Sequence, residues 1–324
     1  MNFPSLAPIS GRISLVIPVF NEALSLAKLF AEIDAVSLKL KDRNFEVIFV
    51  DDGSSDESGK AIDALMKADP RVRGIRFRRN FGKAAALHAG FEQSTGEVVF
   101  TLDADLQDDP AEIPRFLDAL KDFDLVSGYK QVRHDPWSKV FPSRVFNGLV
   151  SFFTGVKLHD HNCGFKAMRA DVAREICLYG ELHRFVPVLA NARGFRVGEI
   201  VIAHRPRQFG HSKFGWQRFL KGFLDLLQVT FVTKYGKRPM HFFGTLAVIA
   251  FGLGMLSGLV GLLAILLNFH FVLTTLALGS SGVLTLIAAQ CLLCGFLAEL
   301  QTAQACRERK LPVALPNDSG EPGA

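Results

Sequence analysis

The stretch Gly96-Glu-Val-Val-Phe-Thr-Leu-Asp-Ala-Asp-Leu-Gln107 joins an apolar run directly to an acidic cluster. A continuous run of β-branched and aromatic residues predicts a strand that is buried on both faces, as in a parallel sheet. Ligands of such sheets bind beyond the carboxyl ends of the strands. Asp103 and Asp105 therefore fall where a ligand is expected. The pair alone is also typical of a solvated acidic turn, and its position after a strand favours the functional interpretation.

Strand and helix patterns alternate along the amino-terminal part of the chain. Further β-rich apolar runs predict strands, and apolar residues at helical spacing predict helices between them. The predicted strands are 13–20, 45–50, 72–77, 96–102, 124–127 and 196–203, and the predicted helices are 22–36, 58–66 and 84–93. From the end of the fifth strand to Lys166 we expect mostly loops. The alternation predicts an α/β fold with a doubly wound, mainly parallel sheet.

A second acidic cluster, Asp51-Asp-Gly-Ser54, follows the predicted strand 45–50. A carboxylate at a strand end can accept hydrogen bonds from a ribose hydroxyl or a base N–H, and Gly53 permits a tight turn. A plain surface turn explains this cluster equally well. Two carboxylates spaced as Asp103 and Asp105 can bind a hard divalent cation, Mg²⁺ or Mn²⁺, and such a cation would bridge the diphosphate of a nucleotide-sugar. Together, the two clusters favour one ligand site at the sheet edge.

The carboxy-terminal part is strongly apolar, with no Asp, Glu, Lys or Arg between His241 and Glu299. A bilayer-spanning helix takes about 20 apolar residues, so 242–269 and 272–298 predict two spans. Basic residues flank both outer ends and are missing from the turn, which predicts that both termini are cytoplasmic. Before the spans, 214–233 has one apolar and one polar face, as in a helix lying on a bilayer surface. An ordinary helix packed on the domain is the alternative.

Charge and cysteine content argue against a nucleic-acid-binding protein and against a disulfide-stabilised secreted protein. The formal net charge of +5 is too small to indicate nucleic-acid binding, so no nucleic-acid partner is expected. The five cysteines form no disulfide framework, and no secretory signal is evident, so the catalytic part should stay in the cytoplasm. We expect a catalytic domain at 1–211, an interfacial helix region at 212–240, two transmembrane helices at 241–300 and a flexible cytoplasmic tail at 301–324.

Several motifs, in this order and spacing, resemble the family 2 glycosyltransferases. They are Val16-Ile-Pro-Val-Phe-Asn-Glu22, Val50-Asp-Asp-Gly-Ser54, Asn80-Phe-Gly-Lys83 and Asp103-Ala-Asp-Leu-Gln107. Later motifs resemble the polyprenyl-phosphate branch of that family, which includes dolichol-phosphate mannose synthases and bactoprenol glucosyltransferases. They are Ser127-Gly-Tyr-Lys130, Ser143-Arg144 with Asn147, Asp160 with Gly164-Phe165, and Arg207-x-x-Gly-x-Ser-Lys213. The resemblance covers about residues 12 to 300, nearly the whole chain.

This resemblance implies a GT-A fold and a set of site residues. The nucleoside pocket would be lined by Pro18, Phe20, Glu22, Val50 and Asp52. The metal and the diphosphate would meet Asp103, Ala104, Asp105 and Gln107, with Asp103 and Asp105 as the ligands of Mg²⁺ or Mn²⁺. Lys130, Arg207 and Lys213 would contact the phosphates of the donor.

The remaining roles concern the acceptor and the sugar. Arg144 would hold the acceptor phosphate, and Asp160 is the candidate for a general base or for a carboxylate that orients the sugar. Lys130 stands where relatives often have Arg. Lysine keeps the positive charge but lacks the planar guanidinium group that binds a phosphate through two parallel hydrogen bonds. The stretch Cys163-Gly-Phe-Lys166 replaces a more usual Ser/Gly-Gly-Phe-Arg.

The expected reaction is transfer of a hexose or related sugar, with inversion, from a nucleotide diphosphate-sugar to undecaprenyl or dolichyl phosphate. It would take place at the inner membrane and serve cell-envelope glycan modification. A phosphate monoester is largely dianionic at neutral pH, since its second pKa is about 6, so it needs positioning more than deprotonation. Glucose, mannose, a modified arabinose and an amino sugar all stay open. Some relatives form tetramers, which leaves a homo-oligomer open.

Two alternatives to this function remain. A processive polysaccharide synthase of the same family usually has a Gln-x-x-Arg-Trp motif, which Trp216-Gln-Arg218 does not match. A catalytically idle membrane scaffold would not need an intact Asp-x-Asp with cationic partners.

Overall fold

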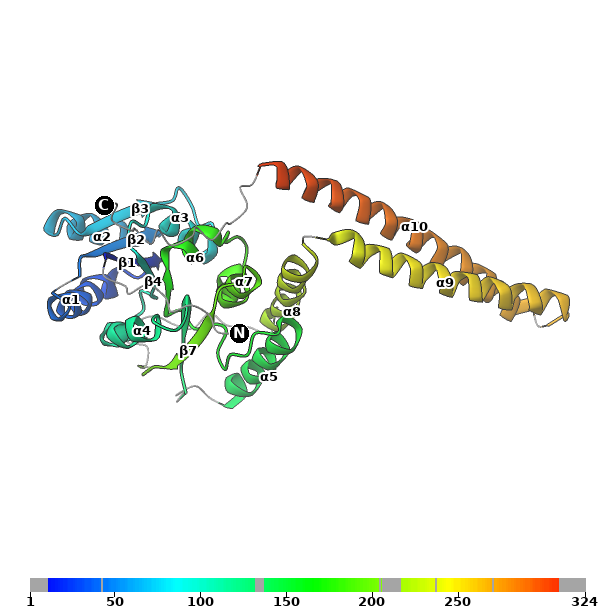
Figure 1. Ribbon diagram of the computed structural model, residues 1–324, viewed down its shortest axis with the longest axis horizontal. Coiled ribbons are helices and arrows are strands. Elements are labelled where there is room, and N and C mark those ends of the chain that lie inside the picture. The colour runs from blue at the N-terminus through cyan, green and yellow to red at the C-terminus, as the bar shows by residue number, and fades with distance from the viewer. Residues whose placement is uncertain are drawn as a thin grey trace, which may run out of the picture. The chain divides into compact units, whose positions relative to one another are not determined.

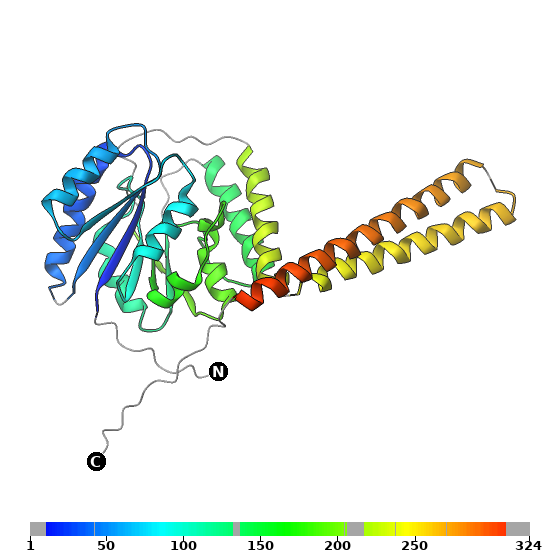
Figure 2. The ribbon, with the colours of Figure 1, turned by 90° about the horizontal axis from the view of Figure 1, so that it is seen from above.

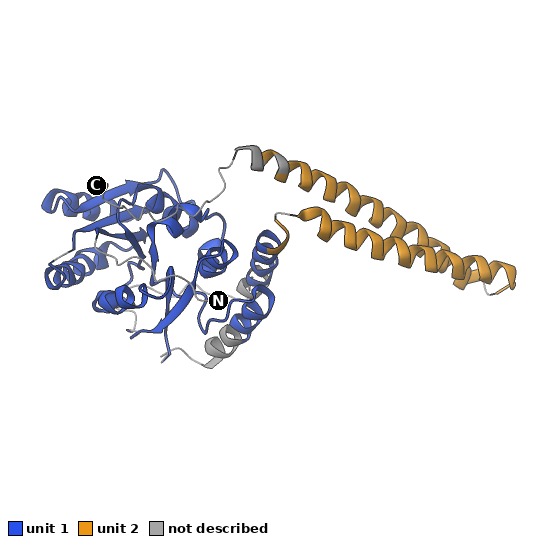
Figure 3. Cartoon of the chain, in the orientation of Figure 1, with its two compact units in different colours: residues 1–233 blue, residues 234–324 orange. Residues whose placement is uncertain are grey.

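The computed structural model of the 324-residue chain describes residues 11–41, 43–131, 137–203, 205, 217–236, 238–269 and 271–308. The side chains of 137–144, 217–221, 303 and 305–308 are outside this description. The chain divides into two compact units, Met1–Thr233 and Lys234–Ala324, which Figure 3 shows in blue and orange.

Among the described residues, the first unit contains a seven-stranded sheet in the order β3-β2-β1-β4-β6-β5-β7. Figure 1 labels β1 to β4 and β7 of this sheet. Its strands are β1 (Ile13–Val19), β2 (Phe45–Asp51), β3 (Val72–Arg76), β4 (Val98–Thr101), β5 (Leu125–Tyr129), β6 (Lys166–Arg169) and β7 (Val197–Val201). Only β6 runs antiparallel to its neighbours, β4 and β5, and the other pairs are parallel. The predicted mainly parallel α/β sheet is confirmed.

Helices lie between the strands, and the three predicted at 22–36, 58–66 and 84–93 are present. They are α1 (Ala23–Lys39), α2 (Ser58–Ala68), α3 (Lys83–Gln93), α4 (Ile113–Ala119), α5 (Trp137–Thr154), α6 (Ala170–Glu175), α7 (Val186–Ala192) and α8 (Gln217–Thr230). Two 3₁₀ turns, η1 (Pro110–Glu112) and η2 (Leu182–Phe185), complete the unit among the described residues. A π-helical turn, η3 (Phe231–Tyr235), spans the boundary at Thr233.

The prediction of loops up to Lys166 is wrong, because α5 occupies much of that segment. Prolines and basic residues indicated loops, but tertiary packing outweighs this local signal. Phe146 and Val150 lie one helical turn apart, and both pack into the buried cluster that also holds Phe185. The short strand β6, also missed, has only four residues and charged residues at both ends.

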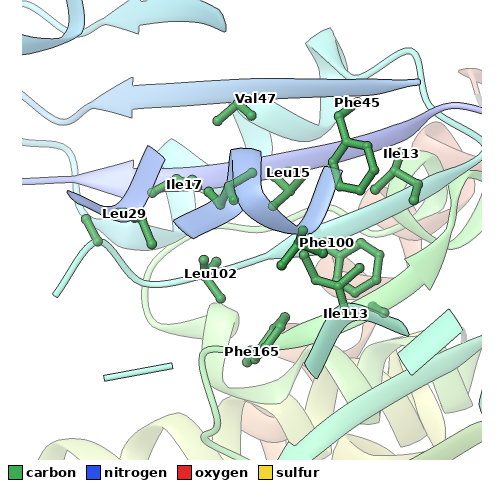
Figure 4. Close-up of a cluster of buried hydrophobic side chains, with 14 of the residues drawn as sticks. Ile13, Leu15, Ile17, Leu29, Phe45, Val47, Phe100, Leu102, Ile113 and Phe165 are labelled. Carbon is green, nitrogen blue, oxygen red and sulfur yellow. The ribbon is translucent and has the colours of Figure 1, made fainter. Parts of the chain in front are cut away.

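The core has two layers because alternate residues of a strand point to opposite faces of the sheet. Ile13, Leu15 and Ile17 of β1 pack on the face covered by α1, α2 and α4, and Figure 4 shows them beside Phe45 and Phe100. Val16 points to the other face, which α3, α6, α7 and α8 cover. Burying a large apolar side chain stabilises a fold by about 1.5–3 kcal/mol, so these two layers fix the sheet.

The second unit is a hairpin of two long apolar helices, α9 (Pro239–Leu266) and α10 (Phe271–Glu308), visible in Figure 2. Only 22% and 11% of their most apolar windows are buried, so neither is the buried core helix of a globular unit. Their length and exposed apolar surface suit a bilayer, as predicted. The helix α10 itself continues to Glu308, beyond the end of the predicted second span.

Small residues let the two helices of this hairpin approach closely. A Cβ atom added at Gly258 would lie 2.9 Å from Oγ of Ser281, and one at Gly261 would lie 2.8 Å from Leu278. The hydroxyls of Ser257 and Ser280 are 2.6 Å apart and hydrogen-bond across the hairpin. The backbone reverses direction near Asn268, whose φ is +54°.

Candidate active site

The acidic clusters meet at one edge of the sheet, beyond the carboxyl ends of β1, β2 and β4. Because β6 runs in reverse, its amino end and the residues just before it reach the same edge. A cleft of about 280 Å³ opens there. It is lined by Pro18, Val19, Phe20, Glu22, Asp52, Asn80, Gly82, Lys83, Asp103, Ala104 and Asp105.

Asp52 holds a turn on one side of this cleft. Its two carboxylate oxygens accept hydrogen bonds from the backbone N–H groups of Phe81 (2.7 Å) and Gly82 (2.9 Å). Gly53 has φ +69°, and a Cβ there would lie 2.4 Å from the carbonyl carbon of Arg79. This glycine is therefore required for the tight turn, as the sequence indicates. Val50, by contrast, is fully buried in the sheet and does not line the cleft.

The loop after β1 is tied to the loop after β2. Asn21, with φ +59°, donates its backbone N–H to Oγ of Ser54 (3.0 Å), and its side-chain oxygen accepts from the N–H of Ser55 (2.8 Å). The N–H of Glu22 donates to Oγ of Ser58 (2.9 Å). These bonds fix the backbone on which Phe20 and Glu22 face the cleft.

Asp103 pairs with a lysine across the cleft, with Nζ of Lys83 at 2.5 Å from Oδ1. Its other oxygen packs against Gly164, where an added Cβ would lie 2.5 Å from Oδ2. Burial alone would raise the pKa of Asp103. The ammonium groups of Lys83, then Lys130 and Lys166, lower this pKa to about 2. Asp103 is therefore a carboxylate throughout the physiological range.

Asp105 is buried, with only 7% of its surface exposed, although it lines the cleft. Its Oδ1 accepts a hydrogen bond from the N–H of Gln107 (3.1 Å). Between them Leu106 adopts φ +62°, which is strained for a branched residue and bends the chain sharply after the acidic motif. The carbonyl of Gln107 accepts from the N–H of Arg205 at 3.0 Å.

Beneath the acidic motif lies an ion pair between Lys130 and Asp108, 2.7 Å apart. Asp108 is 1% exposed, and burial together with the charges of Asp103 and Asp105 raises its pKa, while Lys130 opposes this. Burial would lower the pKa of Lys130, but the surrounding negative charges, with Asp108 first among them and Asp103 a smaller contributor, together outweigh burial and raise this pKa. The structure thus gives Lys130 a carboxylate partner, and Lys130 is not among the residues that line the cleft.

A small enclosed space of about 10 Å³ lies behind Asp103, enough for about one water molecule. It is lined by Lys83, Leu87, Thr101, Asn162, Cys163, Gly164, Lys166, His183 and Val186. Lys166 is buried and donates to the carbonyl of Cys163, and burial lowers its pKa. Burial also lowers the pKa of His183 to about 3, so this imidazole is neutral at physiological pH.

Asp160 is 3% exposed and lines neither the cleft nor the small space. Its Oδ1 accepts from the N–H of Asn162 (3.1 Å). The neighbouring His161 is also buried, with Nε2 3.1 Å from Oγ of Ser151, and burial lowers its pKa to about 4. Asn147 of α5 donates to the carbonyl of His159 (2.8 Å), which anchors this loop to the helix.

Three predicted contacts lie outside the described residues. They are the side chain of Arg144 and the residues Arg207 and Lys213. Sequence reasoning assigned no role to Lys83, Asp108, Lys166 and His183, which the structure brings to the site. Of these, Lys83 and Lys166 had a signal, since Lys83 ends the motif that begins at Asn80 and Lys166 ends the stretch that begins at Cys163.

The donor set at the cleft fits a divalent cation. Among the described residues no group of three or more His, Cys, Asp and Glu side chains is placed to hold a metal. Asp103 and Asp105 supply hard oxygen ligands, which is typical of Mg²⁺ sites completed by water and substrate phosphates. The residues present therefore fit an ion bound together with a diphosphate.

Comparison with known proteins agrees with this arrangement. Residues 14–177 match the family described as glycosyl transferase family 2. Dodecaprenyl-phosphate galacturonate synthase of Rhizobium johnstonii is 38% identical over 257 residues, which are 78% of this chain and 75% of that protein. Undecaprenyl-phosphate 4-deoxy-4-formamido-L-arabinose transferase of Pseudomonas aeruginosa is 40% identical over 217 residues, 66% of this chain and 64% of that protein.

Solved structures show the same fold at low identity. Glucosyl-3-phosphoglycerate synthase of Mycobacterium tuberculosis, in complex with Mn²⁺, uridine diphosphate and phosphoglyceric acid, aligns with a TM-score of 0.52 and 15% identity. The alignment covers 68% of this chain and 78% of that one. With its sheet, its cleft and its match over half of the sequence, this chain belongs to glycosyl transferase family 2.

Proposed function

We propose that this protein transfers a sugar from a nucleotide diphosphate-sugar to a polyprenyl phosphate at a membrane surface. The proposal rests above all on the cleft at the sheet edge, where Asp52 and the Asp103–Asp105 pair face one space large enough for part of a nucleotide. The two curated relatives are named for undecaprenyl and dodecaprenyl phosphate, which supports a lipid phosphate as the acceptor.

The cleft divides into two chemical parts. Pro18, Phe20 and Glu22 with Asp52 form the side that we assign to the nucleoside. Each oxygen of Asp52 retains a lone pair besides the one that meets the backbone, so it can still accept from a ribose or base. Val50 supports this side from within the sheet.

The opposite side suits the diphosphate and its metal. We assign Asp103 and Asp105 as the ligands of Mg²⁺ or Mn²⁺, with Ala104 and Gln107 supporting that loop. A bound divalent ion supplies charge neutralisation for the departing nucleoside diphosphate. Lys83 faces the same space and adds a positive charge. Lys130, Arg207 and Lys213 are assigned to the phosphates of the donor.

The acceptor needs little activation. A phosphate monoester is largely dianionic at neutral pH, so its oxygen can attack the anomeric carbon directly once it is positioned. We assign Arg144 to hold this phosphate and Asp160 to orient the sugar or accept a proton. Direct displacement at one face inverts the anomeric configuration.

The chain combines a family 2 unit with a pair of apolar helices, which suits an enzyme whose acceptor lies in a bilayer. Two apolar helices follow the family 2 part, and we propose a catalytic region at 1–211, an interfacial region at 212–240, transmembrane helices at 241–300 and a cytoplasmic tail at 301–324. With a short turn between the helices, both ends emerge on one side. We place that side in the cytoplasm at the inner membrane, where nucleotide-sugars are made.

Membranes containing the full-length protein provide the test. They are incubated with undecaprenyl phosphate and a panel of radiolabelled UDP- and GDP-sugars, and the lipid extract is identified by mass spectrometry. One labelled sugar should appear as a polyprenyl-phosphate sugar, and Asp105→Asn should abolish it. Asp118→Asn, an exposed carboxylate that pairs with Lys121, is the matched control. Label that appears only in polymer or as free sugar would overturn the proposal.

A further inference from the structure

Lys83 sits at the boundary of the two spaces described above. It lines both the cleft that faces solvent and the small enclosed space behind Asp103. Its side chain is a third exposed, so it is neither a surface lysine nor fully buried. From this position it reaches Oδ1 of Asp103 at 2.5 Å.

The backbone of Lys83 is held firmly. It is the first residue of α3 and follows the Phe81-Gly82 turn, whose two N–H groups donate to Asp52. Gly82 has φ +95°, a conformation that side chains rarely adopt, so the turn points the next residue in a fixed direction. The ammonium group can therefore contact either the Asp103 carboxylate or an anionic ligand bound in the open cleft.

Both carboxylate oxygens of Asp103 already have close neighbours. Its Oδ1 is taken by Lys83, and its Oδ2 lies against the backbone of Gly164. Three ammonium groups already act on Asp103, those of Lys83, Lys130 and Lys166. A divalent cation at Asp103 would add positive charge beside these ammonium groups, and a diphosphate would offset that charge.

We propose that Lys83 is a built-in counter-cation that competes with the metal for Asp103 and moves to the diphosphate when metal and donor arrive together. Lys83 thereby makes binding of the metal depend on the donor. The lysine is a positioning residue that exchanges one anionic partner for another, and no covalent step is involved. This inference rests on the proposed function only through the assignment of the metal to Asp103 and Asp105.

The test measures Mn²⁺ binding without any turnover. Full-length protein in detergent is titrated with Mn²⁺, and the unbound ion is counted by electron paramagnetic resonance. A neighbouring opposite charge shifts the affinity of a carboxylate for a proton by about 1–3 pKa units. A metal ion competes with Lys83 for the same oxygen, so Lys83→Met should bind Mn²⁺ at least about tenfold more tightly than the wild type.

The second arm adds UDP or GDP to the same samples. Loss of a charge-assisted contact to phosphate should weaken nucleotide binding in the presence of Mn²⁺ by about tenfold in Lys83→Met. The two affinities thus change in opposite directions, whereas a variant that merely distorts the turn would weaken both. Lys83→Gln, with a polar tip, is measured in parallel in case the methionine variant does not fold, and Lys83→Arg should restore weak metal binding.

Lys121→Met is the matched control, because it removes one lysine from an exposed ion pair with Asp118 and leaves the cleft untouched. Its Mn²⁺ and nucleotide affinities should equal those of the wild type. Equal or weaker Mn²⁺ binding by Lys83→Met and Lys83→Gln, relative to the wild type, would overturn this inference and leave the metal assignment intact. Absence of Mn²⁺ binding in every variant, with and without nucleotide, would overturn both.

Discussion

At the scale of single residues, the site is an arrangement of opposite charges in contact. Asp103 meets Lys83, and Asp108 meets Lys130, each within 2.7 Å. Asp105 lies between these pairs in sequence and lines the cleft with little exposed surface. Asp105 can therefore supply one negative charge to a divalent cation in the cleft, and the diphosphate would supply the rest.

The change Asp105→Ala tests this view of the acidic motif. Transfer should fall by at least about 100-fold, because the diphosphate loses electrostatic stabilisation as it departs. Expression, membrane insertion and the thermal unfolding midpoint should stay close to those of the wild type. Initial rates with saturating donor and lipid give the comparison, and wild-type turnover in this variant would remove Asp105 from the metal site.

Arg144→Ala tests the assigned acceptor contact. Loss of a charge-assisted hydrogen bond costs about 1.5–3 kcal/mol, so the KM for lipid phosphate should rise by about tenfold or more. The KM for the nucleotide-sugar should change little. Arg115→Ala, which removes an exposed arginine paired with Glu112, serves as the control. Equal lipid kinetics in both variants would argue against the acceptor role of Arg144.

His161 predicts a pH dependence of stability. Burial lowers its pKa to about 4 in the folded protein, against 6.5 for an exposed histidine. Between these values the unfolded chain takes up a proton that the folded chain does not, so the free energy of unfolding falls as the pH falls. The full contribution is present above pH 6.5, and the loss is on the order of 3 kcal/mol by pH 4.

Urea unfolding of wild type and His161→Asn, measured by tryptophan fluorescence from pH 7.5 to 4.5, checks this dependence. The wild type should lose stability through this window, and the variant should show a flatter profile. Identical slopes would mean that His161 gains a proton in the folded state.

At the scale of elements, close packing of α3 on β1 gives a direct stability test. A Cβ added at Gly90 would lie 2.2 Å from Cγ1 of Val16, a buried strand residue that cannot move aside. Overpacking of this kind costs about 1–3 kcal/mol. At Gly148 in α5 an added Cβ meets no atom of the described residues within 4 Å.

Both glycines lie inside helices, so the same change raises helix propensity by about 1 kcal/mol at each. Gly148→Ala should therefore leave the thermal unfolding midpoint unchanged or raise it, and Gly90→Ala should lower it. Equal midpoints would contradict the close approach of α3 to β1.

Elements with a strong periodic pattern were predictable from the sequence, and short ones were not. The strands β1, β2 and β4 are almost entirely buried and mostly apolar, and the predicted runs coincide with them to within two residues. The strand β6 has four residues, two of them charged, and it pairs only through contacts distant in sequence. Without it, nothing in the sequence shows that Lys166 and Gly164 lie beside Asp103.

The same reason explains which site residues were missed. Asp103 and Asp105 could be predicted from the sequence because they directly follow a buried strand. His183 and Asp108 join the site through the packing of η2 and the bend at Leu106, which no local pattern encodes. Lys83 ends a recognisable motif, yet its ion pair with Asp103 depends on the direction of the Phe81-Gly82 turn.

At the scale of the whole molecule, a family 2 unit is followed by a hairpin with mostly exposed apolar side chains. Truncation after Lys237 should move much of the protein from the membrane to the supernatant after carbonate washing. If α8 alone retains the truncated protein, a second truncation after His211 should release it. Complete retention of both would show that the catalytic part binds the bilayer by itself.

The central claim is that Asp103 and Asp105 hold a metal-bound diphosphate in the cleft. Anomalous X-ray diffraction from crystals grown with Mn²⁺ and UDP or GDP locates the ion directly. We predict one Mn²⁺ peak in contact with both carboxylates and with the diphosphate oxygens. A peak elsewhere, or nucleotide bound away from the cleft, would contradict the account.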